Sequence, residues 1–448
     1  MSKIIALPIE TIVRELDSKL LLTFFLIKNG YDVLIGPRGS IFFELKFLRN
    51  TSLLYKSLSI DQKDVMASVV KNGGKNYILD EEANVFSKNQ DSIIKSIFPK
   101  NMLDFVDIFF LSGEKIKNLV NKNRPEIPNE KLIISGHPRF EFFKKPYMKY
   151  YNNVKDELQN KYKDYILFNL NFSMGNPYRG WDEQISYLNN HPDFNLSYIN
   201  DIKNKMLWQK KNMKEYVKAV ILIAKKYPEI NIIIRPHPSE NENYYKPFFN
   251  KFQNIFIIRS GNVLPWIYAS KVSVHYDCTT GIESVLNGKP SISFTCNRDE
   301  KLVNWLSPYV CNEVSTINQL LCELDTYLNN NEKFSLSQEK SEMLNSYIAN
   351  QSIDSINTIC NAIVSHNQKS TSYYTNTKSR VLLRFKKRLG KYRRIFFNKD
   401  EYTHHFKNLN KKDVLFKLNK FKEITGLEFD FEIKNHGIDT YLISRTSK

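Results

Sequence analysis

Two short stretches carry the residues best suited to chemistry. Arg235-Pro236-His237-Pro238-Ser239-Glu240 follows an apolar run at 232–234, and Asp277-Cys278-Thr279-Thr280-Gly281-Ile282-Glu283 follows the run at 274–276. In an open α/β sheet such a run is a buried parallel strand, and ligands bind where it ends. We therefore predict one binding site built from both stretches, while a plain β-turn and a plain helix cap remain the structural alternative.

The two stretches offer complementary groups for an anionic ligand. Arg235 and His237 supply positive charge and ring N–H donors, and the prolines beside His237 restrict its backbone. Thr279 and Thr280 stand where a helix begins, so hydroxyls and backbone N–H groups form an anion site there. Glu283, one turn further, can accept hydrogen bonds from ribose hydroxyls. The predicted donor nucleotide and phosphate site comprises Arg235, His237, Pro238, Glu240, Thr279, Thr280, Gly281 and Glu283.

Carboxylates after two other apolar runs are the candidates for catalysis. Asp80, Glu81 and Glu82 come directly after the run at 76–79, and Glu10 follows the first apolar run. One of them can serve as a base or nucleophile if it lies at a strand's carboxyl end. Three consecutive carboxylates after a strand more often form a solvated turn, and both interpretations stay open.

Further polar residues fall at positions expected to line the same cleft. Arg14 and Glu15 fall at the start of a predicted helix, where a solvated first turn is the alternative. Asn169, Asn171 and Ser173 are spaced by two, which predicts that they share one strand face. The remaining candidates of this group are His137 and His275.

Composition narrows the class of protein. The chain has 448 residues with 42% apolar content and a formal charge of +18, which indicates a globular protein with an anionic partner. No apolar run is long enough for a membrane-spanning helix, and residues 1–5 do not resemble a signal peptide, so we expect a cytoplasmic protein. The five cysteines show no metal-binding spacing, and we expect reduced thiols and no metal.

Alternating strand and helix patterns predict two domains. Strands are expected at 3–8, 31–36, 68–70, 76–79, 108–111 and 131–134, and again at 165–173, 232–235, 254–258 and 274–276. Residues 141–163 suit a linker, 176–210 an insertion, and 211–226 a helix. We predict the α/β class with two Rossmann-like doubly wound domains, 1–155 and 156–365, facing across a cleft, and a C-terminal helical extension at 366–448.

The C-terminal extension has a distinct charge pattern. Nine of the seventeen residues in 378–394 are Lys or Arg, and apolar residues recur every three or four positions from Val381 to Phe396. This pattern predicts an amphipathic helix over 378–397 that lies on an anionic membrane surface. A helix packed on the protein with a solvated basic face is the alternative.

The motifs together resemble those of bacterial surface carbohydrate biosynthesis proteins. The resemblance rests on Leu7-Pro8-Ile9-Glu10, Leu79-Asp80-Glu81-Glu82, Ser135-Gly136-His137-Pro138, Arg235-Pro236-His237-Pro238 and Cys278-Thr279-Thr280-Gly281. More distantly, the last two motifs are similar to those of CDP-glycerol glycerophosphotransferases, capsule Kdo transferases and bacterial sialyltransferases. The resemblance implies a GT-B fold without a required metal. It also implies a cytidine nucleotide donor whose phosphate contacts His237, Thr279 and Thr280, with a first-domain carboxylate facing the acceptor.

These observations lead to a functional prediction. We expect a glycosyltransferase that moves a sugar, first of all a CMP-linked ulosonic acid, from a nucleotide donor to a glycan or glycolipid acceptor of the cell surface. It needs no cofactor, binds no nucleic acid, and is peripheral on the cytoplasmic side of the inner membrane. The alternatives are a nucleotide-sugar 2-epimerase and a polyol-phosphate transferase with a CDP-linked donor. The sequence leaves open whether transfer inverts or retains the anomeric centre.

Overall fold

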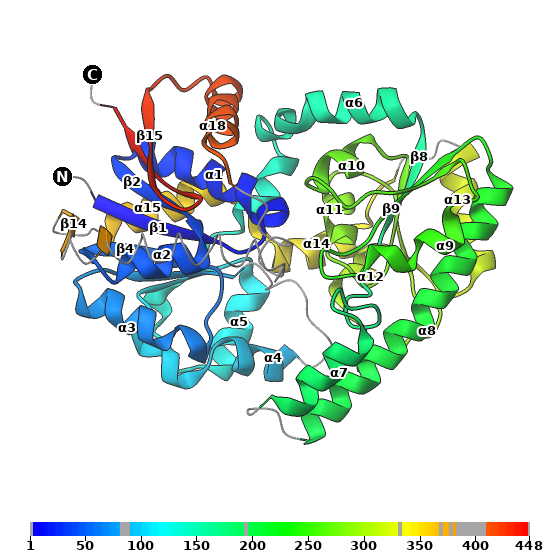
Figure 1. Ribbon diagram of the computed structural model, residues 1–448, viewed down its shortest axis with the longest axis horizontal. Coiled ribbons are helices and arrows are strands. Elements are labelled where there is room, and N and C mark those ends of the chain that lie inside the picture. Colours follow the sequence, from blue (N-terminus) through cyan, green and yellow to red (C-terminus); the bar gives the residue numbers. More distant parts are fainter. Residues whose placement is uncertain are drawn as a thin grey trace. The chain divides into compact units, whose positions relative to one another are not determined.

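The computed structural model describes residues 3–80, 90–191, 196–329, 334–366, 371–375, 380–381 and 409–446. They form two compact units (Figure 1). Unit 1 takes the described residues of 1–84, 90–150 and 345–448, and unit 2 those of 151–344. The first boundary lies close to the predicted position 155, whereas the second lies earlier than the predicted position 365.

Unit 1 contains an eight-stranded sheet in the order β15-β16-β2-β1-β4-β5-β6-β7. The strands from β2 to β7 in this order are parallel, and the β15–β16 hairpin adds antiparallel to β2. The strand bounds are β1 Lys3–Ile9, β2 Tyr31–Pro37, β4 Thr51–Tyr55, β5 Asn76–Leu79, β6 Ile108–Leu111, β7 Leu132–Ile134, β15 Phe431–Gly437 and β16 Thr440–Arg445. The main helices of the unit are α1 Ile12–Lys28, α2 Arg38–Leu45, α3 Lys63–Lys71, α4 Gln90–Ile97, α5 Glu114–Asn123, α15 Ser355–Ser365 and α18 Lys411–Thr425.

The strand order of unit 1 reverses between β1 and β4. The chain leaves β1 for β2 on one side and then builds β4, β5, β6 and β7 on the other. At such a switch point the connections diverge to opposite faces, which opens a crevice at the carboxyl ends of the two central strands. Glu10 directly follows β1 and Lys56 directly follows β4, so both lie at this crevice.

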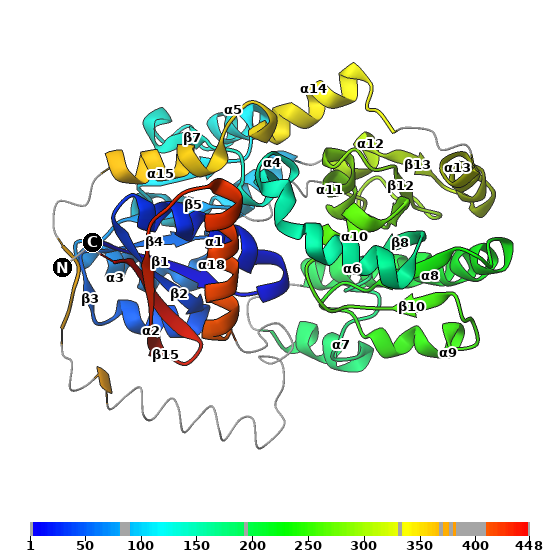
Figure 2. The same cartoon turned by 90° about the horizontal axis from the view of Figure 1, so that it is seen from above.

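The C-terminal part returns to unit 1 instead of forming a separate extension. The Tyr31 hydroxyl of β2 donates to the Ile363 carbonyl of α15, and β16 pairs Ile443 with Val33 of β2. Figure 2 shows α18 and the β15–β16 hairpin beside α1 and β2. The predicted boundaries at 365 and 366 therefore differ from the structure, because buried apolar side chains such as Ile359 and Ile443 tie these elements to the first core.

Unit 2 contains a six-stranded parallel sheet in the order β10-β9-β8-β11-β12-β13. Numbered along the chain, this is the doubly wound order 3-2-1-4-5-6. The bounds are β8 Tyr165–Asn169, β9 Asn231–Arg235, β10 Ile255–Ile257, β11 Val272–His275, β12 Ser291–Phe294 and β13 Asn312–Val314. The helices include α6 Asn152–Tyr162, α7 Trp181–Asn190, α8 Leu196–Lys226, α9 Lys246–Phe249, α10 Leu264–Ala269, α11 Thr280–Leu286, α12 Leu306–Val310 and α13 Ile317–Asn329. Helix α14, Gln338–Tyr347, begins in unit 2 and contains the boundary at residue 344. The predicted class, α/β with two Rossmann-like units, is confirmed.

Most predicted strands are confirmed, and three predictions need correction. Residues 68–70 belong to helix α3, because a short apolar run does not distinguish a buried strand from a helix. The central strand β4, Thr51–Tyr55, was not predicted. The expected insertion at 176–210 instead holds α7 and the first half of α8, which continues unbroken through the predicted helix at 211–226. Within the described residues, no helix is both long enough and apolar enough to cross a membrane.

Gly36 of β2 gives a test of how the C-terminal hairpin is attached. A Cβ added at Gly36 would lie 2.8 Å from Thr440 Oγ1 and 2.9 Å from the Asp439 carbonyl oxygen. Because one obstacle is backbone, we expect Gly36→Ala to lower the free energy of unfolding by about 1–3 kcal/mol. Chemical denaturation measures this loss. Gly39→Ala is the matched control, since a Cβ there meets nothing within 4 Å, and equal stability of the two variants would contradict the prediction.

Candidate functional site

The switch point of unit 2 lies between β8 and β11, and Asp277 organises it. Asp277 follows β11 with a φ of 45°, in the left-handed region that non-glycine residues rarely occupy. Its Oδ1 accepts from the Asn304 backbone N–H at 2.6 Å, and its carbonyl accepts from Asn171 Nδ2 at 2.9 Å. Burial raises the pKa of the Asp277 carboxyl to about 6. The Asp277 carboxyl thus holds the loop after β12, and its backbone carbonyl holds the loop after β8.

The polar start of α11 follows immediately. Thr279 precedes the helix but makes no side-chain capping hydrogen bond, so the structural alternative of a plain hydroxyl cap is not formed and the anion site stays a prediction. Thr280, the first residue of α11, has a buried Oγ1 for which the described part of the chain offers no hydrogen-bond partner. A buried hydroxyl without a partner costs free energy, which a ligand at this position would recover.

His275 is a core residue and does not line the crevice. It is fully buried, and burial lowers the pKa of its ring to about 3, so it is neutral. Its Nε2 lies 3.3 Å from Cys311 Sγ. A Cβ added at Gly281 would lie only 2.3 Å from that Nε2. Gly281 is therefore needed for close packing of α11 against the histidine, a role different from the predicted contact with a ligand.

His237 remains the cationic or donor group best placed for a ligand of unit 2. It follows β9, is partly exposed, and its Nδ1 accepts from the Ser239 backbone N–H at 3.1 Å. That bond places the proton of the neutral ring on Nε2. The adjacent Pro238 is partly exposed as well. The predicted restriction of the ring direction is thus reinforced by a hydrogen bond within the turn.

Glu240 is a structural residue and not a ligand contact. It is 0% exposed, and its Oε1 accepts from the backbone N–H groups of Phe172 at 2.7 Å and His237 at 3.0 Å. The Tyr245 hydroxyl donates to Oε2 at 2.5 Å. Burial raises the pKa of Glu240 to about 7. The carboxyl is occupied with joining the loop after β8 to the turn that carries His237.

Arg235 also has a structural role instead of the predicted phosphate contact. Its guanidinium is buried, donates to the carbonyls of Ser260 at 2.9 Å and Gly261 at 2.7 Å, and stacks over Trp266 at 5.1 Å. Burial lowers the pKa of Arg235 to about 10. The residue holds the loop after β10 against the end of β9, so positive charge for a ligand has to come from elsewhere.

The expected shared face of Asn169, Asn171 and Ser173 is not formed. Strand β8 ends at Asn169, so the other two residues lie in the following loop. Asn169 is buried and donates from Nδ2 to Ser273 Oγ at 3.2 Å, inside the sheet. Ser173 is partly exposed. Glu283 is buried on the first turn of α11 at 4% exposure, and its predicted contact with ribose stays a prediction.

In unit 1, the switch point holds a network of charges around Glu10. Glu10 Oε2 lies 2.9 Å from Lys56 Nζ, and Oε1 accepts from Arg38 at 3.2 Å and from the Tyr55 hydroxyl. Burial would raise the pKa of Glu10, but the Tyr55 hydrogen bond, Lys56 and Arg38 together lower it. Glu10 is 28% exposed in its side chain, so an ionised carboxylate is presented at the crevice.

The second carboxylate of this network is Glu15, which the sequence placed at the start of the helix but did not pair with a lysine. Glu15 is 1% exposed, pairs with Lys19 at 2.7 Å, and lies 3.4 Å from Lys56. It also accepts from the backbone N–H groups of Glu10 and Thr11 at 3.1 Å each. Burial opposes ionisation, but Lys19 and Lys56 lower the pKa of Glu15 to about 2. The i,i+4 spacing of Glu15 and Lys19 was the available sequence signal.

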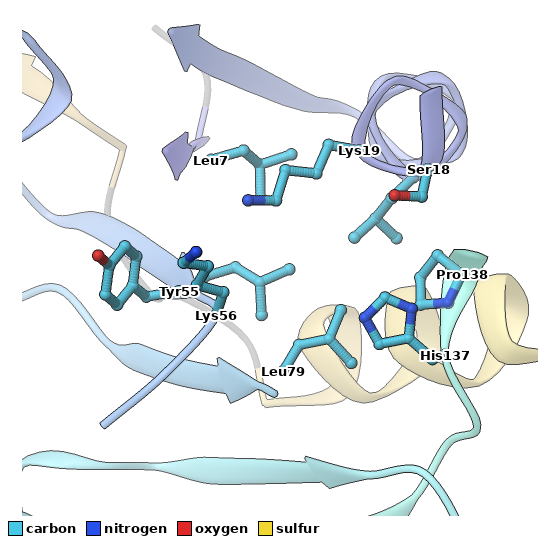
Figure 3. A pocket seen from close by; sticks show the side chains of 10 residues that line it. Leu7, Ser18, Lys19, Tyr55, Lys56, Leu79, His137 and Pro138 are labelled. Carbon is cyan, nitrogen blue, oxygen red and sulfur yellow. The ribbon is translucent and has the colours of Figure 1, made fainter. Parts of the chain in front are cut away.

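A small cavity of about 10 Å³ lies beside this network, room for about one water molecule (Figure 3). It is lined by apolar residues of β1, β4 and β5 together with Lys19, Lys56 and His137. His137 is buried after β7, and its Nδ1 accepts from the Arg139 backbone N–H at 3.0 Å. The predicted cleft residue His137 thus lies at the same sheet edge as Glu10.

The remaining predicted site residues are the carboxylates at 80–82 and Arg14. Asp80 directly follows β5 and is partly exposed, whereas Glu81 and Glu82 lie outside the described residues. Arg14 is partly exposed in the first turn of α1. Among the described residues, no three His, Cys, Asp or Glu side chains are grouped so that they could hold a metal ion.

Most of the predicted membrane helix at 378–397 lies outside the described residues, but Arg380 does not. It is 6% exposed, donates to Glu44 at 3.1 Å, and lies over the Tyr374 ring at 3.4 Å. Arg380 is therefore unavailable to a membrane surface. The prediction that it belongs to the basic face of a membrane-binding helix is wrong. Val381 is 61% exposed.

A scan against protein-family models finds no match, and a search of curated proteins finds none. Among solved structures, the chain is similar to UDP-GlcNAc 2-epimerase from Neisseria meningitidis bound to UDP-GlcNAc, with 14% identity over 82% of this chain and 100% of that chain and a TM-score of 0.47. The UDP-GlcNAc 2-epimerase from Methanocaldococcus jannaschii is 13% identical over 82% of this chain and 100% of that chain, with a TM-score of 0.49. The wall teichoic acid polymerase TagF is 10% identical over 82% of this chain and 89% of that chain, with a TM-score of 0.48.

The buried Glu240 gives a pH-dependent stability that can be measured. Its pKa rises from 4.5 to about 7 on folding, so its contribution to stability is full below pH 4.5 and is lost as the pH rises through 7. Glu240→Gln resembles the protonated form, and we expect it to remove about 2–3 kcal/mol of this pH dependence in denaturation between pH 4.5 and 8. Glu242→Gln is the control, and an unchanged slope in the Glu240 variant would contradict the role.

Proposed function

We propose that the protein is a glycosyltransferase of the GT-B type that takes a sugar from a nucleotide donor bound to unit 2. The observation that carries the proposal is the doubly wound order 3-2-1-4-5-6 of unit 2, whose switch point ends in Asp277 and the Thr279–Thr280 start of α11. Such switch points are where open α/β sheets bind nucleotides. The sugar proposed first is a CMP-linked ulosonic acid, and the acceptor a glycan or glycolipid of the cell surface.

The donor phosphate is proposed to lie against Thr280 and His237. The buried Thr280 hydroxyl supplies a hydrogen bond that the described chain leaves unused, and His237 presents its Nε2 proton. As the bond to the leaving phosphate breaks, negative charge grows on the phosphate, and donors fixed in advance stabilise it. Glu240 and the Asp277 backbone hold these donors in position, so little rearrangement accompanies the reaction.

Glu10 is the carboxylate proposed for the chemistry at unit 1. It lies at a switch point, is partly exposed, and its lowered pKa keeps it ionised near neutral pH. An ionised carboxylate can stabilise positive charge at the anomeric carbon or attack it, and it can take a proton from an acceptor hydroxyl. Glu15 is buried against Lys19 and is therefore a positioning group for the same network.

Two further parts of the functional prediction remain proposals. Peripheral attachment to the cytoplasmic side of an anionic membrane would use the basic residues after Arg380, without Arg380 itself. The reaction is proposed to need no cofactor and no metal, with hydrogen bonds and charged side chains stabilising the phosphate. Retention on anionic liposomes that is lost with rising salt supports the membrane proposal.

Nucleotide binding gives the first test. We expect CMP or CDP, but not UDP, GDP or ADP, to raise the unfolding temperature in a thermal-shift screen without added metal, since a ligand at 100 times its Kd stabilises by about 2.7 kcal/mol. His237→Ala should abolish the shift. His137→Ala removes the same side chain from a similar turn in unit 1 and should retain it. A shift with UDP alone would favour an epimerase or a UDP-sugar transferase, and no shift at all would overturn the donor site.

Glu10→Gln separates chemistry from donor binding. The substitution keeps the shape and the Tyr55 contact but removes the charge, so we expect the nucleotide-induced thermal shift to persist. Release of free nucleotide from the donor that binds should fall by about 10²–10⁴-fold. The rate is measured by withdrawing samples over time and separating donor from free nucleotide by chromatography. Unchanged turnover in Glu10→Gln would exclude Glu10 as the reacting carboxylate.

A further inference from the structure

Unit 2 has a pocket whose lining includes none of the residues proposed for the donor. The pocket has a volume of about 400 Å³, within the range typical of small-molecule sites. It lies where the loop after β8 and the turns before α9 meet the start of α7 and the side of α8, two helices that run beside each other in Figure 1. Neither His237, Thr280 nor Asp277 lines it.

Aromatic and amide side chains dominate the lining. The rings of Trp181 and Tyr244 are partly exposed, and Lys210 Nζ lies 4.4 Å from the Trp181 ring centroid. Aromatic faces bind the apolar C–H faces of flat ligands, and a cation over the indole keeps its plane fixed. The lining residues are Gly175, Asn176, Pro177, Gly180, Trp181, Lys210, Met213, Asn241, Asn243 and Tyr244.

Two of the amides retain hydrogen-bonding capacity. Asn241 Oδ1 accepts from the Asn243 backbone N–H at 3.1 Å, and Asn243 Oδ1 accepts from Lys246 at 2.7 Å. Within the described residues, neither amide NH₂ group makes a hydrogen bond. Each side chain therefore has a fixed oxygen and a free pair of donors at the pocket.

The pocket is formed before any ligand arrives. Gln209 Oε1 accepts from the backbone N–H groups of Met174 and Gly175 at 2.9 Å each, and Asn176 Nδ2 donates to the Asn241 carbonyl at 2.9 Å. A Cβ at Gly175 would lie 2.7 Å from the Lys210 backbone nitrogen, so the loop contacts α8 closely. Preformed walls reduce the entropy lost on binding.

We propose that this pocket binds a sugar ring of a glycan, with the pyranose lying against Trp181 or Tyr244 and its hydroxyls accepting from Asn241 and Asn243. A pyranose has an apolar face and a rim of hydroxyls, which matches aromatic faces beside amide donors. Sugar binding here can be tested separately from donor binding, because none of the proposed donor or catalytic residues lines the pocket. The role of the site in transfer rests on the proposed function. It would hold a part of the acceptor remote from the reacting group, and remote contacts of this kind lower the barrier to transfer.

Saturation-transfer NMR on the full chain tests the proposal. The probes are the methyl glycosides of glucose, galactose, rhamnose and N-acetylglucosamine at about 5 mM, a concentration suited to millimolar Kd values, equivalent to about −4 kcal/mol. We expect at least one glycoside to receive saturation, strongest at the ring protons of one face. Trp181→Ala should reduce the signal at least fivefold, and so should Asn243→Ala, a more exposed position that leaves the core intact.

Controls keep this test separate from the donor site. His237→Ala should retain the glycoside signal while losing the nucleotide-induced thermal shift, so failure of either site is recognised on its own. Phe416→Ala, an exposed aromatic on α18 of unit 1, is the matched control and should also retain the signal. The proposal is overturned if no glycoside receives saturation from the wild-type chain. It is equally overturned if the signal survives in both Trp181→Ala and Asn243→Ala.

Discussion

The loops at the carboxyl ends of parallel strands present backbone N–H and carbonyl groups that the sheet cannot satisfy. In this protein, buried ionisable side chains supply the missing partners. Glu240 accepts from two backbone N–H groups in unit 2, Arg235 donates to the carbonyls of the loop after β10, and Glu15 accepts from the backbone of Glu10 and Thr11 in unit 1. Hydrogen bonds that involve a charged group are stronger than neutral ones. They can therefore hold loops whose backbone groups have no hydrogen-bond partners in the sheet. The positions of His237 and Glu10 depend on these three residues.

The two units use one local device to direct a histidine. In both, a His-Pro pair follows a strand of the parallel sheet, and the ring Nδ1 accepts from the backbone N–H two residues later, at 3.0 Å in His137 and 3.1 Å in His237. The bond fixes the tautomer of the neutral ring and the direction of Nε2. The surroundings then separate the two residues, because His137 is buried beside a cavity for one water molecule and His237 is partly exposed.

The sequence predicted the architecture well because its strands are apolar, β-branched and bounded by turn residues. It located the loops of the candidate site for the same reason. It could not separate ligand contacts from structural residues, since both are polar residues at strand ends. Arg235 and Glu240 were expected to contact a ligand and are buried among backbone groups, whereas the ion pair of Glu15 with Lys56 beside Glu10 was not predicted. The return of α15 and the β15–β16 hairpin to unit 1 was equally hidden, because pairing across several hundred residues leaves no local pattern.

In the network around Glu10, two glutamates differ in burial and therefore in role. Glu10 and Glu15 both lie near Lys56, and both have lowered pKa values. Glu15 is almost fully buried and has its oxygens engaged by Lys19 and two backbone N–H groups, so its charge is fixed in the structure. Its negative charge in turn holds Lys56 in place, and Lys56 orients the more exposed Glu10. A carboxylate in the role proposed for Glu10 has to keep part of its surface open. Tyr55, Lys56 and Arg38 keep Glu10 ionised, and the buried Glu15 contributes indirectly, because its charge holds Lys56 beside Glu10.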